Sequence, residues 1–420
     1  MKIIFYSIIL LFCISGCSKE REVFGKFTFP DNSITFPDNS LKPPYSIPII
    51  KTAEDFENLV YIDPEAVTDG NGSINSPRNI IPEFVENTAY LLKRGTTYRG
   101  SIKEIFTNIL LGAYGEGDMP VVRSERTRAL EILNTSSHST IRDIYFTASG
   151  VTPYGVGIAR VGESGDGFVE HITVAFCKFI GHNEDGAGVY PRNNIGFSGD
   201  DITFFNNEVA YNRSVATTIS GTRIKIIRNW YHNSSKDSEE EPADGGMIAS
   251  YFTSNTMYEC YIAGNIFDRS NSMDKSCLFL NHPWAEETAA NNIAEYNTAY
   301  PPKLGGGGSA FSWSPGTGNT ALRYNVIKAI GLSSPMTVHE GNIEFDSPYG
   351  VRENLILREK GKRVNAVGYN IFLEGLNNHR FYTQEEYKIY LTENPEKNSY
   401  GSDIDTATFL TSEDLLYSNK

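Results

Sequence analysis

The sequence predicts an all-β solenoid, on three observations. Apolar residues alternate with a period of two from about residue 60 to residue 372, whereas an α-helix would repeat them every 3.6 residues or so. An asparagine returns at the same place in successive segments, which is typical of a repeat fold. Glycine (37), tyrosine (24) and phenylalanine (24) are abundant, and leucine- and alanine-rich helical stretches are absent.

The N-terminus has the pattern of an export signal. Lys2 precedes the apolar run Ile3–Ile14, which is too short to span a bilayer, and the run ends in "ISGC". This ending resembles a bacterial lipobox, so we expect residues 1–16 to be removed and Cys17 to be acylated. The alternative is an ordinary secretory signal in which Cys17 is incidental. The expected location is the outer membrane of a Gram-negative bacterium, on its periplasmic or surface face.

Cysteine usage argues against a disulfide framework. Of the five cysteines, Cys13 leaves with the signal and Cys17 is the predicted lipid site, so Cys177, Cys260 and Cys277 remain. Their neighbours are apolar and alternating, and no CxxC motif is present, so we expect small buried side chains rather than disulfide partners or metal ligands.

The acidic balance excludes some classes of partner. The formal net charge of −14 becomes −15 when Lys2 is lost with the signal. Such a chain is poorly suited to broad binding of nucleic acid or anionic lipid. We therefore expect no nucleic-acid partner and contact with the membrane through the lipid anchor only, although a local basic groove remains compatible with this charge. A monomer is also expected.

Residues 17–54 are predicted to be a spacer, and residues 55–415 a single domain. The segment Thr28–Ile34 ("TFPDNSI") is followed at once by Thr35–Ser40 ("TFPDNS") and then by "LKPPYSIP". Proline keeps such a segment extended, so the spacer should lift the domain from the membrane.

Three segments define the repeat: Ile172–Asn183, Ile202–Asn212 and Ile224–Asn233. Each has a strand, then Cys177, Asn207 or Asn229 five residues after its first isoleucine, then a second short strand. The frame continues at Asn265, Asn297, Asn325 and Asn370. Asn207 and Asn229 are 22 residues apart, a plausible length for one coil, and stacked asparagine amides can form a hydrogen-bonded ladder. Asparagine also tolerates the left-handed corner between strands. An array of hairpins is an alternative, but it would not explain the 22-residue frame.

The N-terminal part reads as the first coils of this solenoid. Leu91–Ile102 ("LLKRGTTYRGSI") is preceded by Asp69–Pro77 ("DGNGSINSP") and followed by "GAYGEG", and the chain closes with Phe381–Leu410. These segments resemble exported right-handed parallel β-helix proteins of the pectate-lyase superfamily. The resemblance implies an all-β, right-handed, single-stranded parallel β-helix with N- and C-terminal caps.

The chain is longer than the basic coil at one corner of the repeat. The excess follows Asn183, Asn233, Asp268 and Thr298, each time just before the next strand. Insertions at one position of a solenoid stack on one face, which is often the binding face. The strands that follow, predicted as the floor of this face, are "GAGVYPR" (186–192), "GGMIASY" (245–251), "SCLFLNHPW" (276–284) and "GSAFSWS" (308–314).

This floor carries the candidate site. Its aromatic and polar residues suit a sugar ring, whose C–H face stacks on an aromatic side chain while its hydroxyls take hydrogen bonds. The alternative is that either tryptophan only covers the core. The predicted substrate-binding residues are Tyr190, Arg269, Asn281, Trp284 and Trp313.

The superfamily implies two reaction types. A polysaccharide lyase takes the proton next to a uronate carboxylate with a basic residue, while a cation or Ca²⁺ neutralises that carboxylate; Lys275, His282 and Arg192 are the candidates. A glycoside hydrolase divides acid and base roles between carboxylates; Asp244 with Asp200 or Asp201 is the candidate. A third reading is a non-catalytic glycan-binding or adhesion lipoprotein. The lyase on a uronate-containing glycan is favoured.

Two further patterns are weaker, and a structural explanation is favoured for each. "NED" (183–185), "GDD" (199–201) and "RIK" (223–225) occur in the order seen in polygalacturonase-like enzymes, but the Gly-His-Gly between them is missing, so coincidence is favoured. Glu239–Asp244 offers carboxylates to Ca²⁺, although such a charge run is more often simply solvated. No histidine has HExxH-like spacing, so no zinc site is predicted.

Overall fold

The computed structural model divides the chain into two compact units, residues 1–34 and 35–420, and the described residues all belong to the second. Those residues are 47–125, 127–148, 157–162, 168–181, 194–212, 215–233, 246–250, 257–268, 276–280, 289–299, 311–313, 320–328, 337–340, 343–345, 379–381, 389 and 392–395. Within these ranges no helix is long and apolar enough to cross a membrane.

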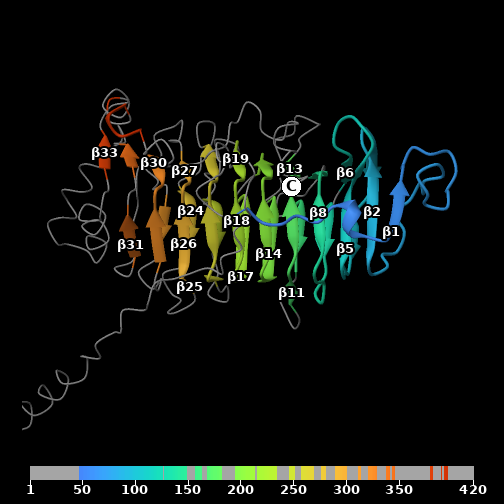
Figure 1. Cartoon of the computed structure of the whole chain (residues 1–420), viewed down its shortest axis with the longest axis horizontal. Coiled ribbons are helices and arrows are strands. Elements are labelled where there is room, and N and C mark those ends of the chain that lie inside the picture. Colours follow the sequence, from blue (N-terminus) through green and yellow to red (C-terminus); the bar gives the residue numbers. More distant parts are fainter. Residues whose placement is uncertain are drawn as a thin grey trace, which may run out of the picture. The chain divides into compact units, whose positions relative to one another are not determined.

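The described strands form three sheets of 11 strands each, which run along the domain (Figure 1). Sheet 1 contains β4 (Ile102–Glu104), β7 (Leu130–Ile132), β10 (Ala159–Val161), β14 (Ile195–Asp200), β17 (Thr217–Thr222), β20 (Gly246–Ser250), β24 (Ser276–Leu280) and β28 (Phe311–Trp313), with β11 (Val169–Glu170), β21 (Met257–Tyr258) and β25 (Ala289–Ala290) beside them. Sheet 2 contains β1 (Asn58–Ile62), β2 (Thr88–Lys93), β5 (Ile109–Tyr114), β8 (Thr140–Arg142), β12 (Thr173–Ala175), β15 (Thr203–Phe205), β18 (Lys225–Ile227), β22 (Tyr261–Ala263), β26 (Asn292–Glu295), β29 (Thr320–Arg323) and β31 (Thr337–Glu340). Sheet 3 contains β3 (Thr97–Arg99), β6 (Val121–Ser124), β9 (Tyr145–Ala148), β13 (Lys178–Ile180), β16 (Glu208–Ala210), β19 (Trp230–His232), β23 (Ile266–Asp268), β27 (Thr298–Ala299), β30 (Val326–Lys328), β32 (Ile343–Phe345) and β33 (His379–Phe381).

The chain visits the three sheets in turn, so one coil takes one strand from each. β14, β15 and β16 make such a coil, and β17 then returns to sheet 1 beside β14. Among the described strands, neighbouring coils pair in parallel and in register, as in Ile195 with Thr217 and Thr203 with Lys225. This is the parallel β-helix predicted from the sequence, and it excludes the alternative of a hairpin array, whose strands would be antiparallel.

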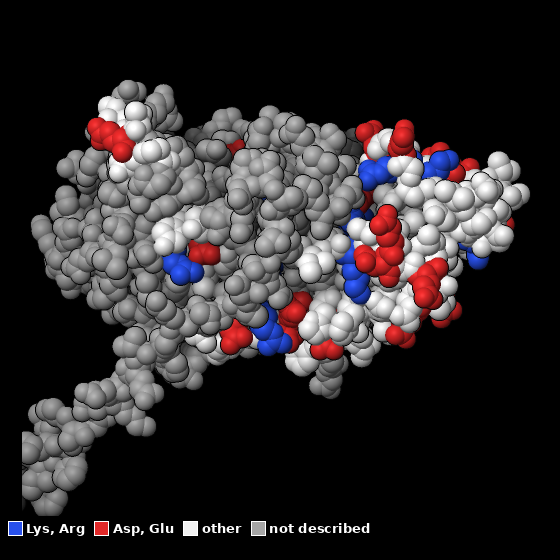
Figure 2. Space-filling view, in the orientation of Figure 1, with Lys and Arg blue, Asp and Glu red and all other residues white. Residues whose placement is uncertain are grey.

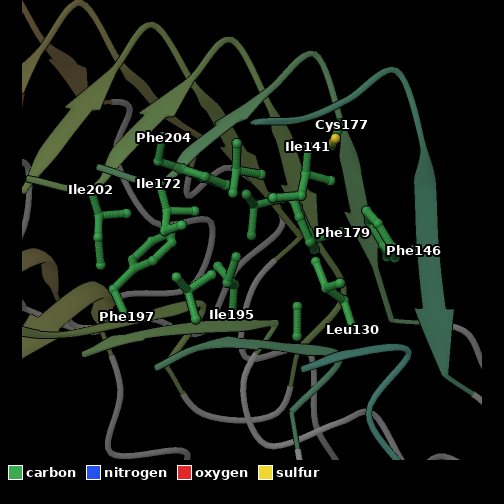
Figure 3. Close-up of a cluster of buried hydrophobic side chains, with 14 of the residues drawn as sticks. Leu130, Ile141, Phe146, Ile172, Cys177, Phe179, Ile195, Phe197, Ile202 and Phe204 are labelled. Atoms are coloured by element: carbon green, nitrogen blue, oxygen red, sulfur yellow. The ribbon is translucent and has the colours of Figure 1, made fainter. Parts of the chain in front are cut away.

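The core lies between the sheets, because alternate residues of each short strand face inward. Figure 3 shows Ile172, Ile202, Phe204 and Phe179 among these side chains, and all four are fully buried. Phe146 and Phe179, from adjacent coils, stack with ring centroids 5.3 Å apart. Each coil therefore buries its apolar side chains largely against its neighbours, as expected of a solenoid.

A ladder of buried asparagines occupies the corner between sheets 2 and 3, as predicted. Asn229 Oδ1 accepts from the backbone N–H of Asn207 at 2.8 Å and from its Nδ2 at 3.0 Å. Asn229 Nδ2 in turn donates to Asn265 Oδ1 at 3.0 Å and to the carbonyl of Phe204 at 2.9 Å. The same pattern joins Asn265 to Asn297 and Asn297 to Asn325.

The left-handed backbone at this corner belongs to the residue before each ladder asparagine. Asn206 (φ 53°), Arg228 (φ 57°) and Gly264 (φ 64°) take this conformation, and the ladder asparagines themselves do not. The sequence-based assignment of the left-handed corner to the ladder asparagine is therefore wrong for Asn207, Asn229 and Asn265. The physical reason is that the preceding residue turns the chain outward, which frees the asparagine amide to point inward and bond along the axis. Asn370 lies outside the described residues.

Two of the cysteines are buried as expected. Cys177 and Cys260 are free thiols with no exposed surface. Burial raises the pKa of the Cys260 thiol to about 12 and moves that of Cys177 in the same direction. Both side chains therefore fill space in the core as neutral groups.

An N-terminal strap, residues 47–52, crosses the outer face of sheet 2 and appears as the blue segment across the strands in Figure 1. Ile47 and Ile50 are buried against Phe176 and Phe205 and other apolar side chains from the strands they cross. Lys51 Nζ donates to Asn108 Oδ1 at 2.7 Å and to the carbonyl of His138 at 3.0 Å. The last residues of the segment predicted as spacer are thus part of the folded domain, and the 3₁₀ turn Ala53–Asp55 connects them to β1.

We expect Asn229→Ala to lower the free energy of unfolding by about 3 kcal/mol, because it leaves several buried backbone and amide groups without partners. Urea unfolding followed by circular dichroism measures the change. Asn75→Ala is the matched control, since Asn75 is exposed and should change stability by no more than about 0.5 kcal/mol. Equal effects of the two substitutions would contradict the role of the ladder.

Candidate functional site

The strands that follow the long connections stack in one sheet. β20, β24 and β28 are consecutive strands of sheet 1, and β17 and β14 continue the sheet toward the N-terminal coils. The register runs through Thr218, Ala249, Phe279 and Ser312. Because these strands pair in parallel, the residues at which they begin all lie along the same side of sheet 1.

One predicted floor strand is displaced in the sequence. The prediction used residues 186–192, which lie outside the described residues. The strand that pairs with β17 in this coil is β14, Ile195–Asp200. The floor of this coil is therefore formed by "IGFSGD", because the alternation that buries Ile195, Phe197 and Gly199 supplies the inward face that sheet 1 needs.

Small side chains cover the described centre of the outer face of sheet 1. In β14 the half-buried, outward positions are Gly196, Ser198 and Asp200, and in β17 Thr218 and Ser220 alternate with buried residues. A Cβ at Gly196 would lie 2.9 Å from Thr218 Oγ1, so a larger residue here would have to displace the Thr218 side chain. These small side chains form a polar strip on the outer face of sheet 1, with Asp200 at the end of β14 as its charged member.

Charged side chains extend this strip toward the N-terminus. Lys103 in β4, Glu131 in β7 and Arg160 in β10 are aligned in register, and Arg160 is aligned with Gly196. Glu131 Oε1 lies 3.4 Å from Lys103 Nζ and 3.3 Å from Arg128 Nη1. Sequence reasoning missed this group. Its signal was the alternation of charged and apolar residues in "IKE", "LEI" and "ARV".

A second charged group lies where sheet 1 turns into sheet 2. Asp200, at the end of β14, forms an ion pair with Arg223 of the next coil. Asp201 accepts from Lys225 Nζ at 2.8 Å, and its other oxygen lies 2.8 Å from His171 Nδ1. His171, Asp201 and Arg223 have φ values of 53°, 48° and 55°, so successive coils turn this corner in the same left-handed way.

Asp201 is held ionised by these partners. Burial alone would raise the pKa of its carboxyl, but the hydrogen bond and charge of Lys225, followed by those of His171, outweigh burial and lower the pKa below its ordinary value. A carboxylate of this kind suits a base or an ion-pair partner, and it is unsuited to donate a proton at neutral pH.

The residues of the "GDD" and "RIK" motifs are thus in contact, but at the corner between sheets 1 and 2. Asp201 is the corner residue itself, and Lys225 belongs to sheet 2, whereas the strip described above belongs to sheet 1. Asn183–Asp185 lie outside the described residues. The pairing of each aspartate with a cation of the next coil supports the structural explanation of these motifs.

A third cluster lies on the outer face of sheet 3. Glu208 accepts from Lys178 Nζ at 2.8 Å and lies 3.0 Å from His232 Nε2, and Trp230 stacks on His232 with ring centroids 4.0 Å apart. Burial would raise the pKa of Glu208, but His232 and Lys178 together lower it. This cluster is on a different sheet from the strip, so it is not part of the same surface.

Most of the predicted site residues lie outside the described residues: Tyr190, Arg192, Asp244, Arg269, Lys275, Asn281, His282 and Trp284, as does the predicted lipid site Cys17. The backbone of Trp313 is described and ends β28, paired with Leu280. Trp313 is the residue directly after Ser312. It is Ser312, not Trp313, that is aligned with Phe279, Ala249 and Thr218. Among the described residues, no group of three or more His, Cys, Asp or Glu side chains is arranged to hold a metal ion.

Comparisons with known proteins show likeness of fold only. No protein-family model and no curated protein matches the sequence. Two solved structures of a GH136 lacto-N-biosidase from Eubacterium ramulus are similar over 78% of this chain and 68% of theirs, at 11% identity and a TM-score of 0.41. Pectate lyase Pel9A is similar over 70% of this chain and 76% of its own, at 12% identity and a TM-score of 0.39.

We expect Asp201→Asn to lower the free energy of unfolding by about 1 kcal/mol at neutral pH, because the variant loses two ion pairs that are partly exposed. The lowered pKa of Asp201 means that this stabilisation is present above the unfolded-state value of about 4 and is lost as the pH falls further. Urea unfolding across this pH range measures the difference between variant and wild type.

Glu57→Gln is the control for this experiment, since Glu57 is exposed. It should match the wild type throughout. A difference between Asp201→Asn and wild type that stays constant from neutral pH to well below pH 4 or so would show that ionisation of Asp201 contributes nothing to it.

Proposed function

We propose that the protein binds a uronate-containing polysaccharide along the outer face of sheet 1 and cleaves it by β-elimination, as a polysaccharide lyase. The observation that carries this proposal is the stacking of β14, β17, β20, β24 and β28 in one sheet. Four of these five strands, all but β17, follow connections longer than the basic coil. A solenoid with insertions stacked beside one face has the architecture of a binding groove.

The dimensions of the strip suit a polymer. Aligned positions on neighbouring strands are about 4.8 Å apart, so the row from Lys103 in β4 to Ser312 in β28 extends over about 34 Å. Small polar side chains along its described centre leave room for a chain of sugar rings and offer hydroxyls for hydrogen bonds.

The chemistry of a lyase requires a base and a neutralising cation. Lys275 directly precedes β24, and His282 follows it by two residues, so the sequence puts both candidate bases next to a floor strand. Arg192 and Arg269, in the connections before β14 and β24, are the candidate cations for the substrate carboxylate. Ca²⁺ bound through Glu239–Asp244, before β20, is the alternative source of that positive charge.

The second candidate function, a glycoside hydrolase, is favoured by one observation. Asp201 directly follows β14, and its lowered pKa keeps it ionised, which is the state that a hydrolase base requires. The mechanism also needs a protonated carboxyl, for which Asp244 is the candidate. The ion pairs that hold Asp200 and Asp201 count against this function, because both carboxylates already have cationic partners. A non-catalytic glycan-binding lipoprotein is the third candidate.

The first experiment offers purified mature protein a panel of uronate polysaccharides and follows the ultraviolet absorbance of the unsaturated product. We expect absorbance to rise, and Lys275→Ala or His282→Ala to slow the rise by about 100-fold or more, because each removes a candidate base. Loss of activity on chelation that CaCl₂ restores would identify Ca²⁺ as the neutralising cation. New reducing ends without absorbance would replace the lyase by the hydrolase.

A substitution on the outer face of sheet 1 tests whether the substrate binds there. Thr218→Trp should raise KM on the same substrates because the indole would obstruct the strip, whereas Ile180→Trp, the same bulk on sheet 3, should leave KM unchanged. Binding without cleavage would leave a glycan-binding protein, and neither binding nor cleavage of any polysaccharide would refute the proposal as a whole.

We also propose that the protein is an outer-membrane lipoprotein acylated at Cys17. Cells expressing the full chain should incorporate labelled palmitate into the protein, and Cys17→Ala should abolish incorporation, because the thiol is the acceptor. Cys277→Ala is the matched control. Unlabelled wild-type protein released as a soluble form would instead identify an ordinary secretory signal.

A further inference from the structure

We infer that Lys103, Arg128 and Arg160 form a cationic subsite that binds a carboxylate of the glycan at the N-terminal end of the sheet 1 strip. The inference rests on the proposed function for the identity of the ligand, and it adds the residues that select an acidic sugar. The strands that carry them, β4, β7 and β10, lie several coils before β24, beside which the candidate bases Lys275 and His282 stand in the sequence, so the subsite would act on binding rather than on the chemical step.

Backbone register puts Lys103 and Arg160 on one surface, and the ion pair with Glu131 brings Arg128 to the same place. Lys103 and Arg160 flank Glu131 on the adjacent strands β4, β7 and β10. Ile102, Ala159 and Val161 are buried beside them, so the charged residues take the outward positions of their strands. Because Arg160 is also aligned with Gly196, the subsite continues directly into the small side chains of the strip.

Two of the three cations, Lys103 and Arg128, share one carboxylate. Lys103 and Arg128 both approach the same atom, Glu131 Oε1, at 3.4 Å and 3.3 Å. Charge-assisted hydrogen bonds are usually about 2.7–2.9 Å long, so neither contact is a close pair. At the corner with sheet 2, by contrast, Asp200 and Asp201 are each held by a cation of the next coil.

Exposure favours a ligand of negative charge. The Lys103 side chain is 55% exposed and that of Arg128 23% exposed, whereas Glu131 is only 10% exposed. A ligand would therefore meet the cations before the carboxylate. Lys103, Arg128 and Glu131 together carry one net positive charge, within a chain whose formal net charge is −14. A local cation excess of this kind attracts an anion that the rest of the surface repels.

Two contacts hold the arginines in position. Ser101 Oγ donates to the carbonyl of Arg128 at 2.6 Å, which fixes the backbone that carries this side chain. Arg160 Nε donates to the carbonyl of Gly162 at 2.8 Å, which orients its guanidinium along β10. A guanidinium held in this way loses little freedom on binding, and its planar donors match the two oxygens of a carboxylate.

The test compares a polyuronate with the same polymer after reduction of its carboxyl groups to alcohols. Retardation of the protein in gels that contain each polymer gives the dissociation constants. Lys103→Gln and Arg160→Gln should each raise the constant for the polyuronate about tenfold, because each removes one charged contact. Neither should change binding of the reduced polymer. Where cleavage is measurable, KM should rise with kcat unchanged.

Two further variants make the test specific. Glu131→Gln should strengthen binding of the polyuronate severalfold, because it removes the carboxylate that competes with the ligand. Arg99→Gln is the matched control, an exposed arginine on sheet 3 whose loss should have no effect. Circular dichroism confirms that each variant is folded.

The outcomes separate this inference from the proposed lyase. Unchanged constants in Lys103→Gln and Arg160→Gln, an equal effect on the reduced polymer, or an equal effect of Arg99→Gln would each overturn the subsite. Carboxylate-dependent binding that requires Lys103 and Arg160, without any unsaturated product, would overturn the lyase and keep the subsite. Unsaturated product with an unchanged KM in Lys103→Gln and Arg160→Gln would keep the lyase and overturn the subsite.

Discussion

The structure depends on hydrogen bonds that run along the axis of the solenoid, and the asparagine ladder is their most demanding part. Each ladder amide is fully buried, so its partners must come from inside the protein, and most of them belong to the neighbouring coils. Asn229 meets this condition only if the coils before and after it are in register. One misplaced coil would leave polar groups unpaired on both sides, which makes the ladder a strong constraint on register.

This constraint separates the part of each coil that cannot vary from the part that can. Successive ladder asparagines are 22, 36, 32 and 28 residues apart from Asn207 to Asn325, yet they bond in the same way. The additional residues therefore do not change the register of the described strands on either side of them. The strands of sheet 1 that follow these additional residues keep their register, so the face beside them can carry a site without disturbing the core.

The coils repeat the same backbone, but the charged side chains on their outer surface differ from one region to another. At the corner between sheets 1 and 2, the carboxylates of Asp200 and Asp201 are held by cations of the next coil, which reinforces the stacking. At the N-terminal end of sheet 1, Lys103 and Arg128 share Glu131, and the outward positions Gly196, Ser198, Thr218 and Ser220 beyond them carry no charge. Figure 2 shows acidic and basic side chains close together over the N-terminal coils, so the identity of each pair matters more than the overall charge.

The sequence by itself determined the fold class, the ladder and the burial of Cys177 and Cys260, because a period-two pattern and a recurring asparagine reflect contacts that every coil repeats. It did not determine which residue takes the left-handed corner, where the strand after Asn183 begins, or that residues 47–52 pack on sheet 2. Only the tertiary structure decided these, and it alone aligned Lys103, Glu131 and Arg160. Their neighbours come from different coils, and in a solenoid the spacing between coils varies with each insertion, so no fixed sequence interval reveals which side chains meet.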